Sequence, residues 1–386
     1  MIRNSLFGFG RKMLLIIAAI AGICLVTVPA MAETGVEINH KNFPDSALLD
    51  AVLGLDENQD GFLQTEEITK AKELRINKFI NGDDVGEDEK APVYQKSDFK
   101  FNFQGIQYLA GLESLEVNLS GGATKDGKHY DSVIFNFTQV YRLKKLTSFS
   151  FYSAKQKTIY LSKFPKLEKT DLAVTGLTNL KIDNKYLKKV RIGRSTSGLG
   201  VLDFRKAPKL NTLYIDNLQT PKVYFNNKKM KQMHIESNGK KKIKSMSLKS
   251  LKSLQNLSLT KVNISSLDLS KNFMLVELYL DSCTMKKLDV SKNKKLTWIA
   301  CEGKHTKSIV LPPKNVISTF KWVNAGRYKF NGSRLNADTL TSVILFGNKI
   351  QSLDLKRFRK LDFVFVDKGV KVKLAPNLSA GNIIHY

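Results

Sequence analysis

Residues 266–280 read SLDLSKNFMLVELYL, and residues 287–301 read KLDVSKNKKLTWIAC. The two stretches begin 21 residues apart, and apolar side chains fall at the same places in both. Similarity of a chain to itself at a short, fixed period is the sequence signature of a repeat solenoid. We therefore predict a stack of similar coils for this part of the chain.

The same period extends in both directions from these two stretches. Towards the N-terminus it passes through Val223, Leu202, Leu180 and Ile159, and it resumes at residues 343–355. A coil of this length has too little apolar surface to fold alone, whereas stacked coils bury their leucines in one core and pair their strands. Residues 304–340 keep the period less well, so we expect an irregular coil there.

The repeat resembles the leucine-rich repeat, whose pattern is L-x-x-L-x-L-x-x-N/C-x-L. Residues 275–285 match it with Cys283 at the Asn/Cys position, and Asn348 fills that position later. The short repeat with its Leu-Asp-Leu-Ser segment is similar to the internalin-like group of bacterial extracellular proteins. The resemblance implies a β-rich repeat solenoid with coils of about 21 residues, a small helical N-terminal cap and a role in binding.

Three regions are expected from these observations. Residues 1–32 are predicted to be a signal peptide, residues 33–92 a helical cap that resembles an EF-hand, and residues 93–386 the solenoid. Residues 370–386 are expected to cover the far end of the stack. Charge follows this division, because residues 33–90 hold 15 acidic and 6 basic side chains, whereas residues 91–386 hold 20 acidic and 53 basic ones.

The N-terminal segment has the features of a secretory signal. Arg3, Arg11 and Lys12 precede an uncharged, mostly apolar run at residues 14–28, and Ala30-Met31-Ala32 supplies small residues for cleavage. The run is shorter than the roughly 18 residues that a spanning helix needs. We expect a secreted or loosely surface-associated protein without stable membrane insertion after cleavage.

The acidic cap contains a candidate calcium loop at residues 56–67, between predicted helices at 44–55 and 65–76. Its spacing matches the twelve-residue EF-hand loop, with Gly61 at the sharp turn. A single loop of this kind favours a structural role with an affinity of about 10⁻⁴ to 10⁻³ M. The alternative is a loop of the same shape without useful affinity. The predicted ligands of calcium are Asp56, Asn58, Asp60, the Phe62 carbonyl, Gln64 and Glu67.

A candidate binding surface follows from strand geometry. Side chains alternate along a strand, so the residue between two inward leucines points outward in every coil. Aromatic rings beside carboxylates suit sugars or basic protein side chains, although strands also favour Tyr and solvated faces carry charge. We expect a protein or glycan to bind this concave face at Arg191, Tyr214, Asp216, His234, Glu236, Tyr279, Asp281 and Glu302.

Lysines near the turns define a second candidate surface. A row of cations along one edge would attract a linear polyanion such as teichoic acid, an acidic polysaccharide or nucleic acid. The alternative is that these lysines only keep the solenoid soluble. The candidate residues of this lysine edge are Lys206, Lys228, Lys229, Lys271, Lys292 and Lys294.

Catalytic chemistry has little support in the sequence. No two histidines are spaced as metal ligands on a helix, and no CxxC pair occurs. Cys283 and Cys301 occupy inward repeat positions, so we predict buried, unpaired thiols. We expect a binding protein and not an enzyme: a recognition module using the concave face, or a polyanion-binding protein using the lysine edge.

Overall fold

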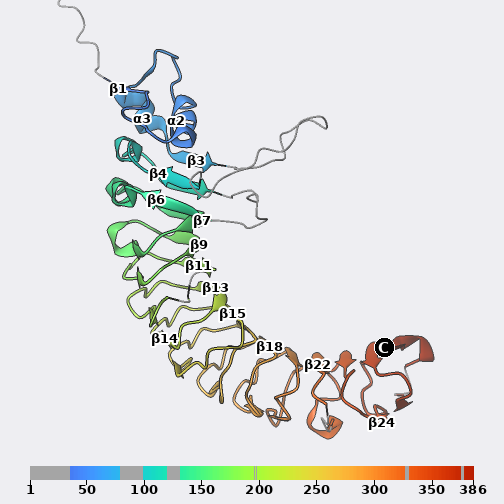
Figure 1. Cartoon of the computed structure of the whole chain (residues 1–386). Coiled ribbons are helices and arrows are strands. Elements are labelled where there is room, and N and C mark those ends of the chain that lie inside the picture. Colours follow the sequence, from blue (N-terminus) through green and yellow to red (C-terminus); the bar gives the residue numbers. More distant parts are fainter. Residues whose placement is uncertain are drawn as a thin grey trace, which may run out of the picture.

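The protein is a curved stack of coils in the computed structural model (Figure 1). The structure describes residues 35–78, 99–119, 131–194, 196, 198–326, 330–374 and 378–386. The predicted signal peptide at residues 1–32 lies outside these residues. No helix in the described ranges is long and apolar enough to span a membrane. A repeat solenoid with few helices, as predicted, is confirmed.

Two short helices and a two-stranded sheet form the N-terminal cap. The helices are α2 (Ser46–Leu53) and α3 (Thr65–Lys70), and β1 (Val36–Glu37) pairs antiparallel with β2 (Phe62–Leu63). The carboxylate of Asp45 accepts a hydrogen bond from the Ala47 amide at 3.1 Å and so begins α2. Helix α2 buries Leu48 and Val52 against the first coils, which places the cap on the end of the stack.

The predicted second helix, residues 65–76, is too long. Helix α3 ends at Lys70, and β3 (Glu73–Asn77) follows as the first strand of the main sheet. Leu74 and Ile76 are buried while their neighbours are exposed, which is the alternation of a strand with one inward face. The solenoid therefore begins before residue 93, and the expected boundary at 92/93 falls between the described ranges.

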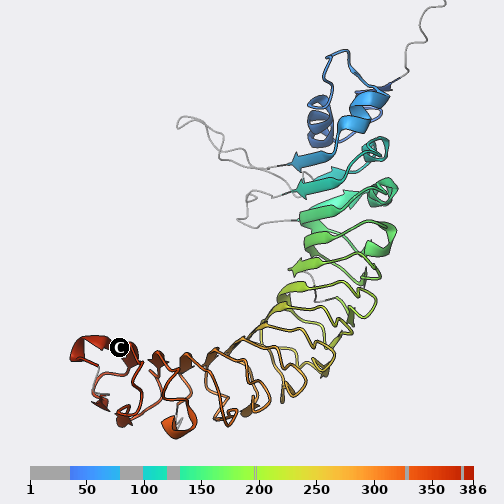
Figure 2. The ribbon, with the colours of Figure 1, turned by 180° about the vertical axis from the view of Figure 1, so that it is seen from behind.

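Over the described residues, a parallel sheet of 16 strands lines the inner side of the curve (Figures 1 and 2). Strands β4 (Lys100–Asn102) and β6 (Ser132–Phe135) join it off the main path. The strands of the main path after β3 are β5 (Ser114–Asn118), β7 (Ser148–Lys155), β9 (Lys169–Thr175), β11 (Lys189–Gly193), β13 (Thr212–Leu218), β15 (Gln232–Ser237), β17 (Asn256–Thr260), β18 (Glu277–Asp281), β20 (Trp298–Glu302), β22 (Thr319–Val323), β23 (Ser342–Ile344), β25 (Phe363–Val366) and β27 (Ile383–His385).

Shorter parallel strands lie on the outer side of the coils. They are β8 (Thr158–Tyr160) with β10 (Asn179–Lys181), then β12 (Leu202–Asp203) with β14 (Lys222–Tyr224) and β16 (Ser245–Met246), then β19 (Lys287–Asp289) with β21 (Ser308–Val310), and β24 (Ser352–Asp354) with β26 (Lys371–Lys373). Five 3-10 turns complete the described part: η2 (Ile106–Tyr108), η3 (Phe137–Arg142), η4 (Leu161–Lys163), η5 (Gly332–Arg334) and η6 (Ala380–Asn382).

The structure refines one expectation about the C-terminal half and corrects another. The irregular stretch at 304–340 does not interrupt the inner sheet, because β20 pairs with β22 and β22 with β23 in register. Residues 370–386 add another coil and not a separate cover, since β26 pairs with β24 and β27 with β25.

The inward side chains form one continuous core. Leu257, Leu278 and Ile299 follow one another in adjacent strands, and each is almost fully buried. Burying one such side chain contributes roughly 2 kcal/mol. Phenylalanines replace leucines near the N-terminal end, where the rings of Phe103 and Phe151 lie 5.6 Å apart.

Buried asparagines connect the coils at their turns. The amide of Asn227 donates to the carbonyls of Phe204 and Ala207, in the preceding coil, at 2.9 and 2.7 Å. Asn272 makes the same pair of bonds to Leu248 and Leu251 at 3.0 and 2.9 Å. These bonds satisfy turn carbonyls that the core removes from water.

The prediction of buried, unpaired cysteines is confirmed. Cys283 and Cys301 are both buried and form no disulfide. Burial raises the pKa of the Cys283 thiol to about 11 and that of Cys301 to about 12. Both thiols therefore act as small apolar groups in the core.

Candidate functional site

The outward positions of the inner sheet form a continuous column. The pairing register joins Glu116, Ser150, Asp171, Arg191, Tyr214, His234, Ser258, Tyr279, Ala300, Lys321 and Ile344, one residue from each coil, as expected from the sequence. Arg75 extends the column at its start. Phe365 follows Ile344 at the other end of the column.

The middle of this column is a hollow with aromatic walls, which we call the aromatic hollow. Its volume is about 260 Å³, and Tyr214 and His234 stand on one side of Ser258 while Tyr279 and Trp298 stand on the other. The rings of Tyr214 and His234 lie 6.2 Å apart, and those of Tyr279 and Trp298 lie 6.1 Å apart. Both separations are typical of interacting aromatic pairs. The hollow exists because a small serine stands between two aromatic pairs.

Polar side chains complete the lining of the aromatic hollow. Gln232, Asn256, Glu277 and Trp298 stand at the same position of four successive strands, two residues before the central column. The amide of Asn256 donates to the carboxylate of Glu277 at 2.6 Å. We did not predict these residues, although the alternation that selects Ala300 also turns Trp298 outward.

The predicted acidic residues Glu236, Asp281 and Glu302 lie at corresponding positions of neighbouring strands, but their carboxylates have local partners. In adjacent strands, Glu236 is paired with Thr260, Thr260 with Asp281, and Asp281 with Glu302. Lys261 lies 3.6 Å from the Glu236 carboxylate, and Lys321 lies 2.5 Å from that of Glu302. Glu236 and Glu302 therefore sit in ion pairs, whereas Asp281 accepts a hydrogen bond from the Ser282 hydroxyl at 2.8 Å.

Arg191 and Asp216 form an ion pair one coil before the aromatic hollow. The Nε and Nη2 of Arg191 donate to one carboxylate oxygen of Asp216 at 3.0 and 2.9 Å. Burial raises the pKa of the neighbouring Asp171, and the charge of Arg191 opposes that rise. The eight predicted residues thus share one face, with Tyr214, His234 and Tyr279 at the aromatic hollow and the charged residues beside it.

The Tyr279 hydroxyl at the aromatic hollow is partly shielded from water. The pKa of Tyr279 rises to about 12, first because of burial and second because of the nearby Glu302 carboxylate. The hydroxyl therefore stays protonated over the whole physiological range.

The predicted calcium loop turns sharply at Gly61. Gly61 has a positive φ of 82°, and its amide donates to the Asp56 carboxylate at 2.9 Å. The Asp60 amide donates to the Asn58 side-chain oxygen at 3.1 Å. The side-chain oxygen of Gln64 is buried and has no hydrogen-bond partner among the described residues. A buried oxygen without a partner is what a cation would satisfy.

The closing carboxylate of the loop is turned towards the backbone. Glu67 accepts from the amides of Glu57 and Gln64 at 2.8 and 2.9 Å. In this arrangement, no group of three or more His, Cys, Asp or Glu side chains in the described ranges could hold a metal ion. Half of the predicted donors are of other kinds, namely Asn58, Gln64 and the Phe62 carbonyl. The six donors fit calcium in chemical type, whereas the three carboxylates alone do not form a cluster.

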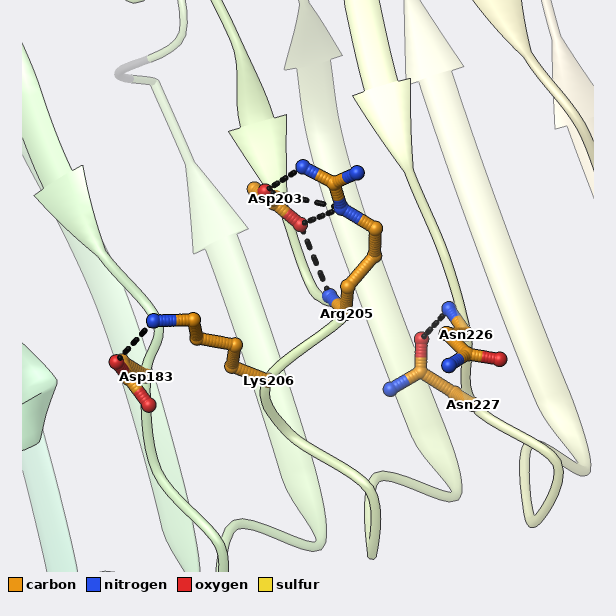
Figure 3. Close-up of polar contacts among 6 residues, drawn as sticks. All are labelled: Asp183, Asp203, Arg205, Lys206, Asn226 and Asn227. Atoms are coloured by element: carbon orange, nitrogen blue, oxygen red, sulfur yellow. Dashed lines mark hydrogen bonds and ion pairs between the residues drawn. The ribbon is translucent and has the colours of Figure 1, made fainter.

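The lysine edge carries mixed charge. All six predicted lysines are exposed, but Lys206 lies 3.1 Å from the Asp183 carboxylate (Figure 3). In the same figure Arg205 binds the Asp203 carboxylate, with Nη2 at 2.6 Å. Lys249 pairs in the same way with Asp268 at 3.0 Å. A polyanion would meet alternating charges along part of this edge.

Comparison with known proteins places the fold. No family model matches the sequence, and no curated protein matches it significantly. An internalin (inlF) from Listeria monocytogenes strain 4b F2365 is similar in structure, with a TM-score of 0.56 and 17% identity over 90% of this chain and 95% of that chain. The chain has the leucine-rich-repeat fold of an internalin.

A second internalin structure supports the same fold. The functional domain of InlJ from Listeria monocytogenes, which includes a cysteine ladder, matches with a TM-score of 0.53 and 18% identity. The match covers 88% of this chain and 63% of that one. At identities this low, the two comparisons establish the shared architecture alone.

Proposed function

We propose that this protein is an exported recognition module that binds a protein or a glycan at the aromatic hollow of its concave face. The observation that carries the proposal is the hollow at Ser258, between Tyr214 with His234 and Tyr279 with Trp298. Binding, and not catalysis, is the role that we assign to it.

The chemistry of the aromatic hollow suits a ligand with a flat apolar face and polar edges. Aromatic side chains offer large apolar surfaces, and Tyr and Trp also supply hydrogen-bond donors. Gln232, Asn256 and Glu277 add polar groups at the border. A sugar ring, or an aromatic side chain of a protein, combines these properties.

An alternative is electrostatic binding of a polyanion along the lysine edge. It is favoured by Lys228, Lys229, Lys271, Lys292 and Lys294, which are exposed and form no ion pair within the described part of the chain. Such binding would weaken steeply with salt, because it releases counterions. Binding at the aromatic hollow would change little with salt.

The test is a binding screen of the purified protein with calcium present. The panel holds neutral glycans, host-surface proteins, teichoic acid and DNA, each at low and high salt. Ser258→Phe fills the aromatic hollow without removing its walls, and Ser150→Phe places the same side chain elsewhere in the same column. We expect a salt-resistant ligand that Ser258→Phe abolishes and Ser150→Phe spares.

Two outcomes would contradict the proposal. Equal loss with both phenylalanine variants would mean that the aromatic hollow is not the contact. Binding restricted to polyanions and lost at high salt would assign function to the lysine edge instead.

We further propose that calcium stabilises the cap through the loop at residues 56–67. Asp56, Asn58, Asp60, Gln64 and Glu67 would hold the ion with the Phe62 carbonyl. A bound cation would neutralise the converging acidic groups and join α2 to α3. The supporting observations are the turn at Gly61 and the unpartnered oxygen of Gln64.

We also propose export, followed by a secreted or loosely surface-bound state. The proposal rests on the pattern of residues 1–32. Mass spectrometry of protein recovered from a culture medium should give an N-terminus at Glu33. Recovery only of cell-associated protein that begins at Met1 would contradict cleavage.

A further inference from the structure

A larger hollow, which we call the basic hollow, lies in the coils after β21 and before β25. Its volume is about 580 Å³, and residues 311–315, residues 333–336 and Arg357 line it. Three of the lining residues are cations, namely Lys314, Arg334 and Arg357. No acidic residue lines the hollow. The concave face and the predicted lysine edge do not include these residues.

At the basic hollow, the turn position that carries an aspartate in three earlier coils holds an uncharged residue. These aspartates are Asp203, Asp268 and Asp289, and the Oδ1 atoms of Asp268 and Asp289 accept from the backbone amide two residues later at 2.9 Å. Val310 stands opposite Asp289 in the paired strands β19 and β21. The corresponding position of the next coil, 21 residues after Val310, is Asn331.

Asn331 makes the same turn hydrogen bond as the aspartates of other coils but carries no charge. Its side-chain oxygen accepts from the Ser333 amide at 3.1 Å, as the aspartates accept in their own coils. Two consecutive coils at the basic hollow therefore lack a turn carboxylate of the kind that Asp268 offers to Lys249. Lys314 and Arg334 have no turn aspartate in their own coils.

The cations of the basic hollow are not neutralised by the protein. Arg357 donates from Nη1 to the Ser333 carbonyl at 3.1 Å and from Nη2 to the Leu335 carbonyl at 3.3 Å, which fixes its guanidinium by neutral groups. Lys314, Arg334 and Arg357 make no ion pair within the described residues. Positive charge held without a carboxylate attracts an anion.

We propose that the basic hollow binds a phosphate monoester carried on a sugar-sized or glycerol-sized body. A phosphate monoester carries a charge of about −1.5 to −2 and three acceptor oxygens, which match three cations better than the single charge of a carboxylate does. Arginine and phosphate also pair with two parallel hydrogen bonds. The volume lies within the roughly 300–1,000 Å³ of small-molecule sites and exceeds what a bare phosphate would fill.

The test is calorimetric titration of the purified protein with glycerol 3-phosphate, inorganic phosphate and glucuronate. Asn331→Asp restores the missing carboxylate and keeps the hydrogen bond to Ser333. Its matched control, Asp289→Asn, makes the reverse change two coils earlier. Lys314→Gln removes a lining cation, and Lys292→Gln removes an exposed lysine of the lysine edge.

We expect glycerol 3-phosphate to bind more tightly than inorganic phosphate or glucuronate. Lys314→Gln should weaken binding at least roughly tenfold, as expected for the loss of a charged hydrogen bond. Asn331→Asp should weaken it by a similar factor, because it adds a negative charge to the turn that carries Ser333 and Arg334. The two control variants should bind as the unmodified protein does. Circular dichroism and urea unfolding would show whether Asn331→Asp keeps the fold.

Three results would overturn the proposal: no heat with glycerol 3-phosphate at millimolar concentration, equal binding by folded Asn331→Asp, or tighter binding of glucuronate. Vesicles of phosphatidylcholine with phosphatidic acid distinguish the source of the monoester. Sedimentation with these vesicles, lost in Asn331→Asp, would identify a lipid headgroup. Binding of glycerol 3-phosphate without vesicle binding would identify a soluble ligand.

Discussion

The Nδ1 of His234 lies 3.0 Å from the Oγ of Ser258 in the next coil. This contact joins one aromatic side of the aromatic hollow to the serine at its centre. Ser258 is also the only small side chain between the two aromatic pairs that line that hollow. The contact therefore fixes the orientation of the His234 ring at the place where we expect a ligand.

Removal of the aromatic walls should abolish ligand binding without unfolding the protein. Tyr214→Ala combined with Tyr279→Ala should weaken binding at least roughly a hundredfold, because aromatic anchors often contribute about 2 kcal/mol or more each. Affinity measurement with the ligand found in the screen checks this. Tyr152→Ala, farther along the same face, is the control, and an equal loss there would argue against a localised site.

Loss of a buried asparagine should destabilise the stack. Asn227→Ala leaves the carbonyls of Phe204 and Ala207 buried without their donor, which costs about 1–3 kcal/mol. The exposed neighbour Asn226, drawn beside it in Figure 3, should tolerate alanine within about 0.5 kcal/mol. Urea unfolding of both variants measures the difference. Equal midpoints would show that the inter-coil bonds contribute little.

Calcium should raise the thermal stability of the protein through the cap. Millimolar calcium is expected to raise Tm, because an ion that binds only the folded state stabilises it. Glu67→Gln should remove most of the effect, while Glu66→Gln, outside the predicted donor set, should keep it. Differential scanning calorimetry with calcium and with a chelator measures both. A Tm that does not respond to calcium would contradict the proposal.

Acid should remove a small stabilising contribution of Asp268. Hydrogen bonds from Ser270 and the Lys249 ammonium lower the pKa of this carboxyl to about 2, below its unfolded value of about 3.9. A lowered pKa stabilises the fold above the unfolded value, and this contribution is lost as pH falls from about 4 towards 2. Half-exposure of the side chain limits it to about 1 kcal/mol. The difference in unfolding free energy from Asp268→Asn should shrink over this range, and a constant difference would contradict the assignment.

The two cysteine thiols should not react with thiol reagents in the folded protein. Cys283 and Cys301 have raised pKa values of about 11 and 12 and are buried, so a thiol reagent at pH 8 should react only as the chain unfolds. In denaturant the protein cleaved after Ala32 should show two reactive thiols, and Cys283→Ser should show one. Fast labelling of the native protein would contradict burial.

The repeat and its outward column were predictable from local sequence. A step of 21 residues carries Leu257 to Leu278 and then to Ile299, and alternation along each strand fixes which side chains face outward. Both rules use only positions along the sequence, so they need no knowledge of how neighbouring coils pack. The aromatic and acidic residues of the concave face could be named for this reason.

Partners between coils could not be predicted in this way. Trp298 joins the wall of the aromatic hollow because the register places it opposite Glu277, with its ring 6.1 Å from that of Tyr279. Glu236 and Glu302 gain lysine partners from adjacent coils. Residues 73–77 alternate apolar and polar side chains too briefly to exclude a helix, and only pairing with β5 makes them a strand. The sequence by itself determined the coil, its inward leucines and its outward column, because these depend on short-range periodicity. The tertiary structure decided where the stack begins, which charges are neutralised and where the surface is hollow, because each depends on side chains that only stacking brings together.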